Sequence, residues 1–296
     1  MAAQQHIPVL LKEVIEQLAL KPGMNAVDGT VGAGGHSASI LDRTAPGGRL
    51  LGLDLDEAAL DSARSTLGRY GSRAMLVREN YKNVRRVLQP DFGPVQAALI
   101  DLGFSSIEID DATRGFSFRA DGPLDMRYDG SAELDAATIV NSWSLDDLAG
   151  ILWEFGEERL ARRIAAAIVK ARREQTIIGT LQLVAIIAGA VPAAYRRGRI
   201  HFATRTFQAL RIAVNDELGN LSAALPEYVE MLQSGGRLAV ITFHSLEDRI
   251  VKHFFKTAAD QGKVEILTKK PLGPSEEEIA SNPRARSAKL RVAQKI

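Results

Sequence analysis

A glycine-rich stretch near the N-terminus, VDGTVGAGGHS at residues 27–37, holds residue types that suit the binding of a nucleotide-type ligand. Gly32, Gly34 and Gly35 let the backbone approach a ligand closely, because they carry no side chain. The helix expected after them begins with free N–H groups, which favour a negative or polar group. The stretch therefore predicts a cofactor-binding turn, and a tight turn without a ligand is the alternative.

The glycine spacing leaves two cofactors open. Gly32-x-Gly34-x-x-Ser37 nearly fits the dinucleotide fingerprint, but serine stands where glycine or alanine is usual. Two carboxylates favour S-adenosylmethionine over NAD. Asp28 precedes the glycines, and Asp54 ends the next expected strand, where it can accept both ribose hydroxyls. We expect S-adenosylmethionine, with NAD as the alternative and a structural role at the strand end as the simpler explanation of Asp54.

A second candidate site follows a later apolar strand, at DLGF. Asp101 in first place and Phe104 in fourth have the outline of the Asp-Pro-Pro-Tyr motif of amino-methyltransferases, with the two prolines replaced. The exocyclic amine of a nucleobase has a delocalised lone pair. An acceptor for its N–H protons and an aromatic wall would align it for in-line attack on a sulfonium methyl. Asp101 is therefore the expected catalytic residue, and capping of the following turn is the alternative.

The elements that must position these residues alternate between strands and helices. Near-continuous apolar strands between helices predict a doubly wound, mostly parallel α/β sheet covered on both faces. Ligands bind at the carboxyl ends of the strands in such sheets, which is where Asp101 stands. The expected strands are 24–29, 49–56, 74–79 and 95–103, and the expected helices lie near 9–20, 35–43, 57–68 and 82–88.

The alternation stops after Asp101. Residues 104–131 are rich in Gly, Asp and Ser without a regular period, and residues 135–195 predict helices, at 144–155, 158–174 and 180–191. Such an interruption predicts an insertion into the sheet domain, and 296 residues suffice for one large domain or two ordinary ones. The sheet pattern resumes with a helical stretch near 203–233, a strand at 237–243, a helix at 245–258 and strands near 263–269 and 287–293.

Charge is distributed unevenly along a chain whose formal net charge is only +1. No acidic residue occurs from 175 to 215, and none follows Glu278. Two basic segments in a neutral protein indicate a local face for a polyanion such as nucleic acid, although solvated helix faces would give a similar pattern. The arginines and lysines of these segments are Arg196, Arg197, Arg199, Arg205, Arg211, Arg284, Arg286, Lys289, Arg291 and Lys295.

Several classes of protein are disfavoured. The chain has no cysteine, which excludes disulfides and thiolate metal sites, and its 5 histidines show no metal-ligand spacing, so we expect no metal. No Gly-x-Ser-x-Gly motif is present, which disfavours a hydrolase. Residues 175–195 carry no charge, but Gln, Thr, Gly and Pro interrupt them, so a buried helix is expected rather than a membrane span. No signal peptide is evident, and we expect a cytoplasmic protein.

Long segments of the chain resemble the ribosomal RNA small subunit methyltransferase H family, which methylates the N4 amine of a cytidine in 16S ribosomal RNA. The longest are ATRTFQALRIAVNDEL at 203–218, RGFSFRADGPLDMR at 114–127 and FHSLEDRIVK at 243–252, and matching segments cover nearly the whole length. The resemblance implies a Rossmann-like class I methyltransferase domain at 1–104 and 203–296, which binds S-adenosylmethionine. It also implies an inserted active-site loop and helical substrate-recognition domain at 105–202.

The family's cofactor contacts carry over onto residues of this chain. Tyr81 stands where the family usually has Phe, and either ring can flank an adenine. Glu108 stands where the family usually has Gln, and a glutamate cannot donate as a glutamine can. By this resemblance the cofactor-binding residues are Gly34, Gly35, His36, Asp54, Tyr81, Asp101 and Glu108.

The substrate implied by the resemblance is small-subunit ribosomal RNA or an assembled small subunit. Its cytosine must be unpaired or flipped out, and held by stacking and edge hydrogen bonds. The stretch RGFSF at 114–118 imitates an RNP1 strand, but no alternating pattern follows, so we expect a loop that closes over the cofactor and the cytidine. Core packing of the phenylalanines is the alternative. The candidate substrate residues are Phe104, Arg114, Phe116, Phe118 and, for contacts to RNA phosphates, Arg196, Arg197 and Arg199.

Other hypotheses stay open at this point. An NAD-dependent oxidoreductase could use the same type of sheet, and an RNA-binding assembly factor could carry a vestigial site. His244 and Ser245 follow the strand at 237–243, where Ser245 could simply N-cap the next helix, with Glu247 and Asp248 in its first turn. A place for this pair in the pocket is the alternative.

Overall fold

The computed structural model describes residues 7–103 and 111–296. The chain divides into two compact units, Met1–Ser105 with Leu218–Ile296 and Ser106–Glu217. Buried apolar side chains form two core clusters in the first unit and one in the second. Each unit is therefore held together by its own hydrophobic core and is described by itself.

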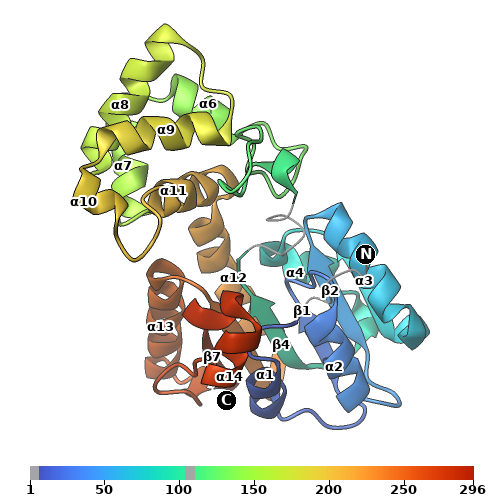
Figure 1. Ribbon diagram of the computed structural model, residues 1–296. Helices are drawn as coiled ribbons and strands as arrows, with labels where there is room; N and C mark the ends of the chain where they lie inside the picture. Colours follow the sequence, from blue (N-terminus) through green and yellow to red (C-terminus); the bar gives the residue numbers. More distant parts are fainter. Residues whose placement is uncertain (1–6, 104–110) are drawn as a thin grey trace. The chain divides into compact units, whose positions relative to one another are not determined.

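The first unit is built on a sheet in which the described residues form seven strands, in the order β3-β2-β1-β4-β5-β7-β6 (Figure 1). The strands β1 to β5 are parallel, and β7 runs antiparallel to both of its neighbours. The expectation of a doubly wound, mostly parallel α/β sheet is confirmed. The strands are β1 Asn25–Asp28, β2 Leu50–Asp54, β3 Ala74–Arg78, β4 Val95–Asp101, β5 Leu232–Thr242, β6 Val264–Ile266 and β7 Lys289–Lys295.

Helices cover both faces of this sheet because successive strand side chains point to opposite faces. Val27 and Leu51 belong to one core and their neighbours Ala26 and Leu50 to the other. The first core packs against α4 (Val84–Val87), α12 (Glu217–Met231) and α13 (Ser245–Asp260). The other core of the first unit packs against α1 (Leu11–Leu18), α2 (Gly35–Arg43) and α3 (Glu57–Leu67). Two shorter elements, α14 (Glu276–Ser281) and η5 (Pro283–Ser287), precede β7.

The sheet order brings the expected site residues to one edge. Strands β1, β2 and β4 end at Asp28, Asp54 and Asp101. Because these strands are parallel and β1 lies between the other two, their carboxyl ends meet at the same edge. The chain leaves β1 toward β2 on one side and reaches β4 on the other, so β1 and β4 form a topological switch point, where ligands bind in such sheets.

The second unit consists of an irregular segment and a set of helices. Phe116, Leu124 and Met126 of the irregular segment are buried in the same core as the helices, here called the second core. The expected helices at 144–155, 158–174 and 180–191 are present with slightly shorter bounds. The helices are α6 Ala136–Ser142, α7 Leu145–Glu154, α8 Ala161–Glu174, α9 Thr180–Ala190, α10 Ala193–Arg196 and α11 Thr204–Asn215.

The helix expected over 203–233 is two helices. Asp216 adopts a left-handed conformation with φ of 48°, which ends α11, and α12 begins at Glu217. Since Phe207 and Leu210 of α11 are buried in the second core, the compact unit extends to Glu217. The division into domains between residues 202 and 203 stays a prediction.

One other expected helix differs from the pattern, whereas the buried helix expected in the uncharged segment is present. The helix expected at 82–88 is a 3-10 turn, η2 (Tyr81–Asn83), followed by the single turn of α4. The uncharged segment 175–195 contains α9, whose Leu183 and Ile187 are buried in the second core. Among the described residues, none of the helices has the length and apolar character that crossing a membrane requires.

Candidate cofactor and active site

The glycine-rich turn joins β1 to α2. Gly32 and Gly34 have φ values of 51° and 85°, a conformation that favours glycine, and α2 begins at Gly35. A Cβ atom on Gly35 would lie 2.4 Å from Cγ of Pro8, so the third glycine allows the N-terminal segment to pack against the turn. The expected turn is therefore present, and part of its glycine content serves packing within the protein.

Asp54 ties this turn to the end of β2. Its Oδ2 accepts a hydrogen bond from the Gly32 N–H at 2.9 Å, and its Oδ1 accepts one from the Asp56 N–H at 3.0 Å. Burial, the largest cause, raises the pKa of the Asp54 carboxyl, although these hydrogen bonds act in the opposite direction. Each oxygen keeps a second lone pair, so the carboxylate can still accept from the hydroxyls of a bound ribose.

Asp28 holds the first part of the same turn. Its Oδ2 accepts from the Ser37 hydroxyl at 2.6 Å and its Oδ1 from the Thr30 N–H at 3.2 Å. The side chain is 1% exposed, and burial raises its pKa to about 6 against the two hydrogen bonds. Ser37, which breaks the dinucleotide fingerprint, thus has a function in the turn as a donor to Asp28.

Asp101 ends β4 beside this turn. Its N–H donates to Oγ1 of Thr30 at 2.6 Å, while its Oδ1 is buried without a hydrogen-bond partner among the described residues. Burial raises the pKa of the carboxyl well above its usual value, and the neighbouring Asp28 and Glu247 raise it further. The geometry leaves Oδ1 as a hydrogen-bond acceptor that the described parts of the protein do not satisfy.

His36 stands between the N-terminal segment and Asp101. Its Nε2 lies 2.9 Å from the Val9 carbonyl oxygen, and its Nδ1 lies 3.6 Å from Oδ2 of Asp101. A carbonyl oxygen only accepts, so Nε2 carries the proton in this contact and a neutral ring turns its Nδ1 lone pair toward Asp101. At 3.6 Å this contact is electrostatic and not a hydrogen bond, so the ring lies beside the Asp101 carboxyl without bonding to it.

The helix after β5 begins differently from the expectation. His244, not Ser245, is the N-cap residue, and its Nδ1 accepts from the Glu247 N–H at 3.4 Å. Oε2 of Glu247 accepts in return from the N–H groups of Phe243 at 2.8 Å and His244 at 3.2 Å. The interpretation of Ser245 as the cap is wrong, because the histidine ring forms this capping box with Glu247. Glu247 is buried and raises the pKa of Asp101, an effect that its expected place in the first turn of the helix did not indicate.

A second residue that the sequence did not indicate lies next to the turn. Tyr228 of α12 is fully buried, and its hydroxyl has no hydrogen-bond partner among the described residues. A Cβ atom on Gly29 would lie 2.1 Å from that hydroxyl and 3.1 Å from Cβ of Tyr81. Tyr81, the first residue of η2, therefore lies close to the turn, as its expected place beside the cofactor requires. Nothing in the sequence distinguishes Tyr228 from an ordinary core residue.

The remaining candidates lie outside the described residues or in the second unit. Phe104 and Glu108 are outside the described residues. Phe116 is buried and stacks on Tyr128 with ring centroids 5.3 Å apart, and the Arg114 guanidinium lies 5.7 Å from its ring. Phe118 stacks on His201 at 4.6 Å. Both phenylalanines thus have partners inside the second unit, as the core-packing alternative expects.

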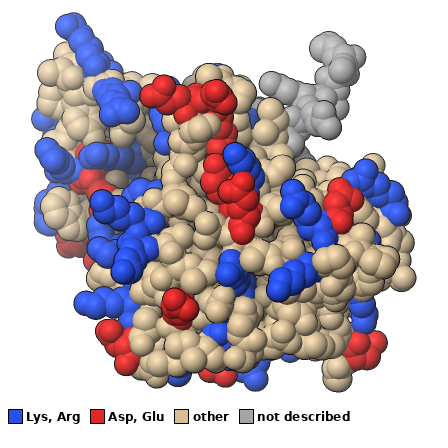
Figure 2. Space-filling model, turned by 90° about the horizontal axis from the view of Figure 1, so that it is seen from below, with Lys and Arg blue, Asp and Glu red and all other residues tan. Residues whose placement is uncertain are grey.

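The arginines of the acid-free segment have different surroundings. Arg196, Arg197 and Arg199 are exposed, whereas Arg211 is buried and donates to both carboxylate oxygens of Glu217 at 2.7 and 2.9 Å. Figure 2 shows Lys and Arg side chains in groups over the surface, with Asp and Glu side chains between them. The exposed arginines are therefore available to a polyanion, and Arg211 is a structural residue.

Comparisons with known proteins agree with these observations. A model of the MraW methylase family matches residues 3–296. A protein of Heliobacterium mobile named ribosomal RNA small subunit methyltransferase H is 49% identical over 98% of this chain and 99% of its own length. The protein of the same name from Heliobacterium modesticaldum is 50% identical over 98% of each chain. A crystal structure of a Clostridium thermocellum protein aligns at 15% identity and a TM-score of 0.49, over 98% of this chain and 99% of that one.

The match to the family model runs along almost the entire chain, and the relatives correspond to it over nearly their full length. The resemblance found in the sequence is thereby confirmed, and the chain belongs to the MraW methylase family.

Proposed function

We propose that this protein transfers a methyl group from S-adenosylmethionine to the N4 amine of a cytidine in 16S ribosomal RNA. The names of its relatives give the substrate class. The observation that carries the chemistry is Asp101, whose Oδ1 is an unsatisfied acceptor at the carboxyl edge of the sheet. Since ribosomal RNA is the proposed substrate, the cytoplasm is the proposed place of action.

The charges around the turn fit S-adenosylmethionine better than NAD. Burial raises the pKa of Asp101 most, and repulsion from the nearby Asp28 and Glu247 raises it further. The turn at 27–37 contains no Lys or Arg that would attract a pyrophosphate. When bound, S-adenosylmethionine supplies a methyl group on a positively charged sulfur, which such carboxylates stabilise. The residues proposed to hold it are Gly34, Gly35, His36, Asp54, Tyr81 and Asp101, with Glu108 as a further proposal outside the described residues.

Asp101 has two tasks in the proposed reaction. Its Oδ1 accepts a hydrogen bond from the N4 amine and so orients the nitrogen toward the methyl group. As the new N–C bond forms and the C–S bond breaks, the amine nitrogen becomes acidic and gives one proton to the carboxylate. His36, with Nδ1 3.6 Å from Oδ2, is the imidazole that lies beside this carboxyl. No strong base is needed, because the amine is neutral and the thioether is a good leaving group.

The second unit is proposed to contact the RNA. Arg196, Arg197 and Arg199 are exposed and can neutralise phosphates. Phe116 and Phe118 are already stacked on neighbours, so they would support the loop rather than hold the base, unless they exchange partners. Phe104 stays a candidate for the aromatic wall.

Methyl transfer to purified RNA tests the proposal. Radioactive S-adenosylmethionine is incubated with the protein and either naked 16S RNA or assembled small subunits, and Asp101→Ala is the comparison. We expect label in the RNA with the wild type and none with Asp101→Ala, while RNA binding persists in both. Titration calorimetry with S-adenosylmethionine and with NAD separates the cofactors, and binding of NAD alone would overturn the proposal.

A further inference from the structure

The helices α12 and α13 enclose a surface groove in the first unit. The groove has a volume of about 350 Å³, and its lining combines apolar and cationic side chains. Among the described residues that line it there is no carboxylate. The residues that line the groove are Ser222, Leu225, Arg249, Ile250, His253 and Phe254.

The topology places this groove toward the edge of the sheet that carries the site. Helix α13 leaves the carboxyl end of β5, so its first turns, with Arg249 and His253, lie toward that edge. Helix α12 leads into the amino end of β5, so its first half, with Ser222 and Leu225, points the same way. Asp101 ends β4, the neighbour of β5. The groove therefore flanks the strand ends where the methyl transfer is proposed to occur.

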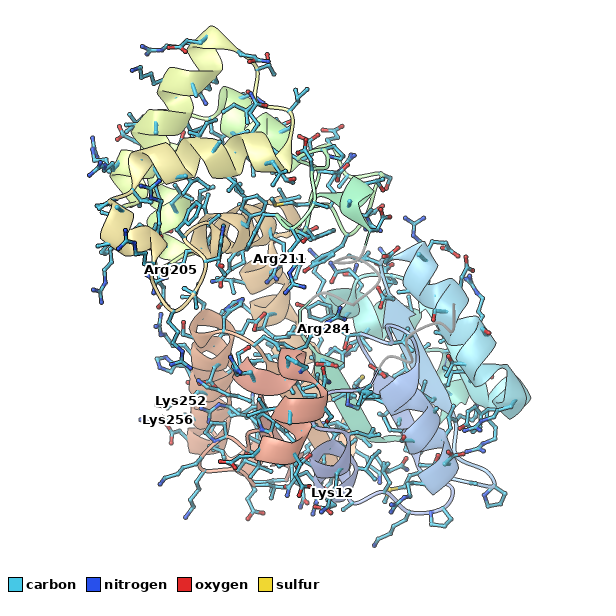
Figure 3. All side chains as sticks on the ribbon, in the orientation of Figure 1. Lys12, Arg205, Arg211, Lys252, Lys256 and Arg284 are labelled. Carbon is cyan, nitrogen blue, oxygen red and sulfur yellow. The ribbon has the colours of Figure 1, made fainter. Side chains whose placement is uncertain are left out.

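A basic stripe continues from the groove along α13. Arg249, Lys252, His253 and Lys256 are exposed and follow the spacing of one helix face. At a rise of about 1.5 Å per residue the stripe extends over about 10 Å. Figure 3 shows Lys252 and Lys256 extending from the same side of α13. Asp248, which precedes Arg249, is turned to β7, where Lys289 and Arg291 donate to it at 3.1 and 2.6 Å. The exposed Asp260 ends the helix four residues after Lys256, beyond the stripe.

We propose that this groove and stripe bind the ribosomal RNA strand that flanks the target cytidine. The inference rests on the proposed function, because it takes RNA as the substrate. Lys252 and Lys256 contact phosphates, and the apolar floor of Leu225, Ile250 and Phe254 receives a base beside them. Charge favours this occupant, since a lining with Arg249 and no carboxylate, beside the exposed Lys252 and Lys256, matches a polyanion. A base with its attached phosphate presents both an apolar face and a negative charge.

The charge part of the proposal is tested by Lys252→Ala/Lys256→Ala. RNA binding is measured against salt concentration with an oligonucleotide of the target sequence and its flanks. We expect Kd to rise about three- to tenfold, the range that two exposed ion pairs give, and the salt slope to fall by about 1.4 for a single strand. Lys12→Ala is the matched control, because Lys12 is an exposed lysine on α1, away from the stripe (Figure 3). It should change neither quantity.

The groove part is tested by Ser222→Trp, which covers the apolar floor without a change of charge. We expect weaker RNA binding with an unchanged salt slope, and Ala223→Trp, at the next exposed position of α12, is the control. In both series the KM for RNA should rise while kcat and the Kd for S-adenosylmethionine stay unchanged. Wild-type affinity in the lysine and Ser222 variants would overturn the inference while leaving the proposed function intact.

Two other outcomes distinguish a failure of the proposed function from a failure of this inference. If the wild type neither binds nor methylates RNA, the proposed function itself fails. If the variants bind naked RNA normally but lose affinity for assembled small subunits, the surface contacts a ribosomal protein, and the inference of an RNA site is overturned.

Discussion

Asp28→Asn is the substitution whose effect on stability follows most directly from the structure. The buried Asp28 carboxyl has a pKa of about 6 in the folded protein, raised from 3.8. Between these two values the folded protein holds a proton that the unfolded chain has released. This contribution to stability is therefore fully present below the lower value, decreases as the pH rises toward about 6, and is lost above it.

The size of the effect follows from the same two values. A pKa raised from 3.8 to about 6 costs the folded protein about 3 kcal/mol at neutral pH. Asparagine does not ionise, but its single acceptor oxygen can serve the Ser37 hydroxyl or the Thr30 N–H and not both, which costs about 1 kcal/mol. We expect Asp28→Asn to be about 2 kcal/mol more stable than the wild type at about pH 8. At about pH 4, where the unfolded carboxyl is already partly ionised, we expect it to be about 0.5 kcal/mol less stable.

Amide hydrogen exchange of the β1 and β4 peptides, with the cofactor absent, measures this difference. Exchange of these strands reports on the first unit, whereas both tryptophans, Trp143 and Trp153, lie in the second. Asp91→Asn is the control, because Asp91 is an exposed aspartate of the same unit that lies outside the glycine-rich turn. If Asp28→Asn destabilised the protein equally at both pH values, the account of the buried carboxyl would be wrong.

Three further predictions concern other buried groups. Arg211→Ala leaves Glu217, whose side chain is 10% exposed, without its cation and should lower the stability of the second unit by about 3–5 kcal/mol. Tryptophan fluorescence in urea measures this stability, and a decrease below about 1 kcal/mol contradicts the prediction. The kcat of methyl transfer should rise with pH, because Asp101 must lose its proton before it can accept one and its pKa is raised; a flat profile argues against its role. Tyr228→Phe removes an unsatisfied buried hydroxyl and should leave stability unchanged or raise it by about 1 kcal/mol; a clear loss in thermal unfolding would reveal a hydrogen bond.

The sheet and the turn could be predicted from the sequence because their signals are local. Apolar strands ending in Asp28, Asp54 and Asp101 follow directly from the order of residues, and parallel strands bring such ends together. No such local signal in the sequence indicates the break between α11 and α12. Asp216 is not a glycine, yet it adopts the left-handed conformation that an aspartate tolerates at a helix end.

Parts of the site depend on contacts between distant segments, and these could not be predicted. The Tyr228 hydroxyl, from α12, lies close to Gly29 after β1, and Glu247, from the helix after β5, raises the pKa of Asp101 at the end of β4. Both residues have ordinary local explanations, one as a core residue and one as a capping residue. Phe116 and Phe118 show the converse, since their aromatic pattern suggested a ligand and the fold gives them partners in the second core.

The most direct test of the central claim is mass spectrometry of 16S RNA fragments after incubation with S-adenosylmethionine and the protein. Fragmentation to the nucleoside and then to the base shows whether a methyl group is on the base or the ribose. The account predicts one cytidine with a methyl group on its exocyclic amine after incubation with the wild type, and none with Asp101→Ala. A methyl group on a ribose, on another base, or on no nucleotide at all would contradict it.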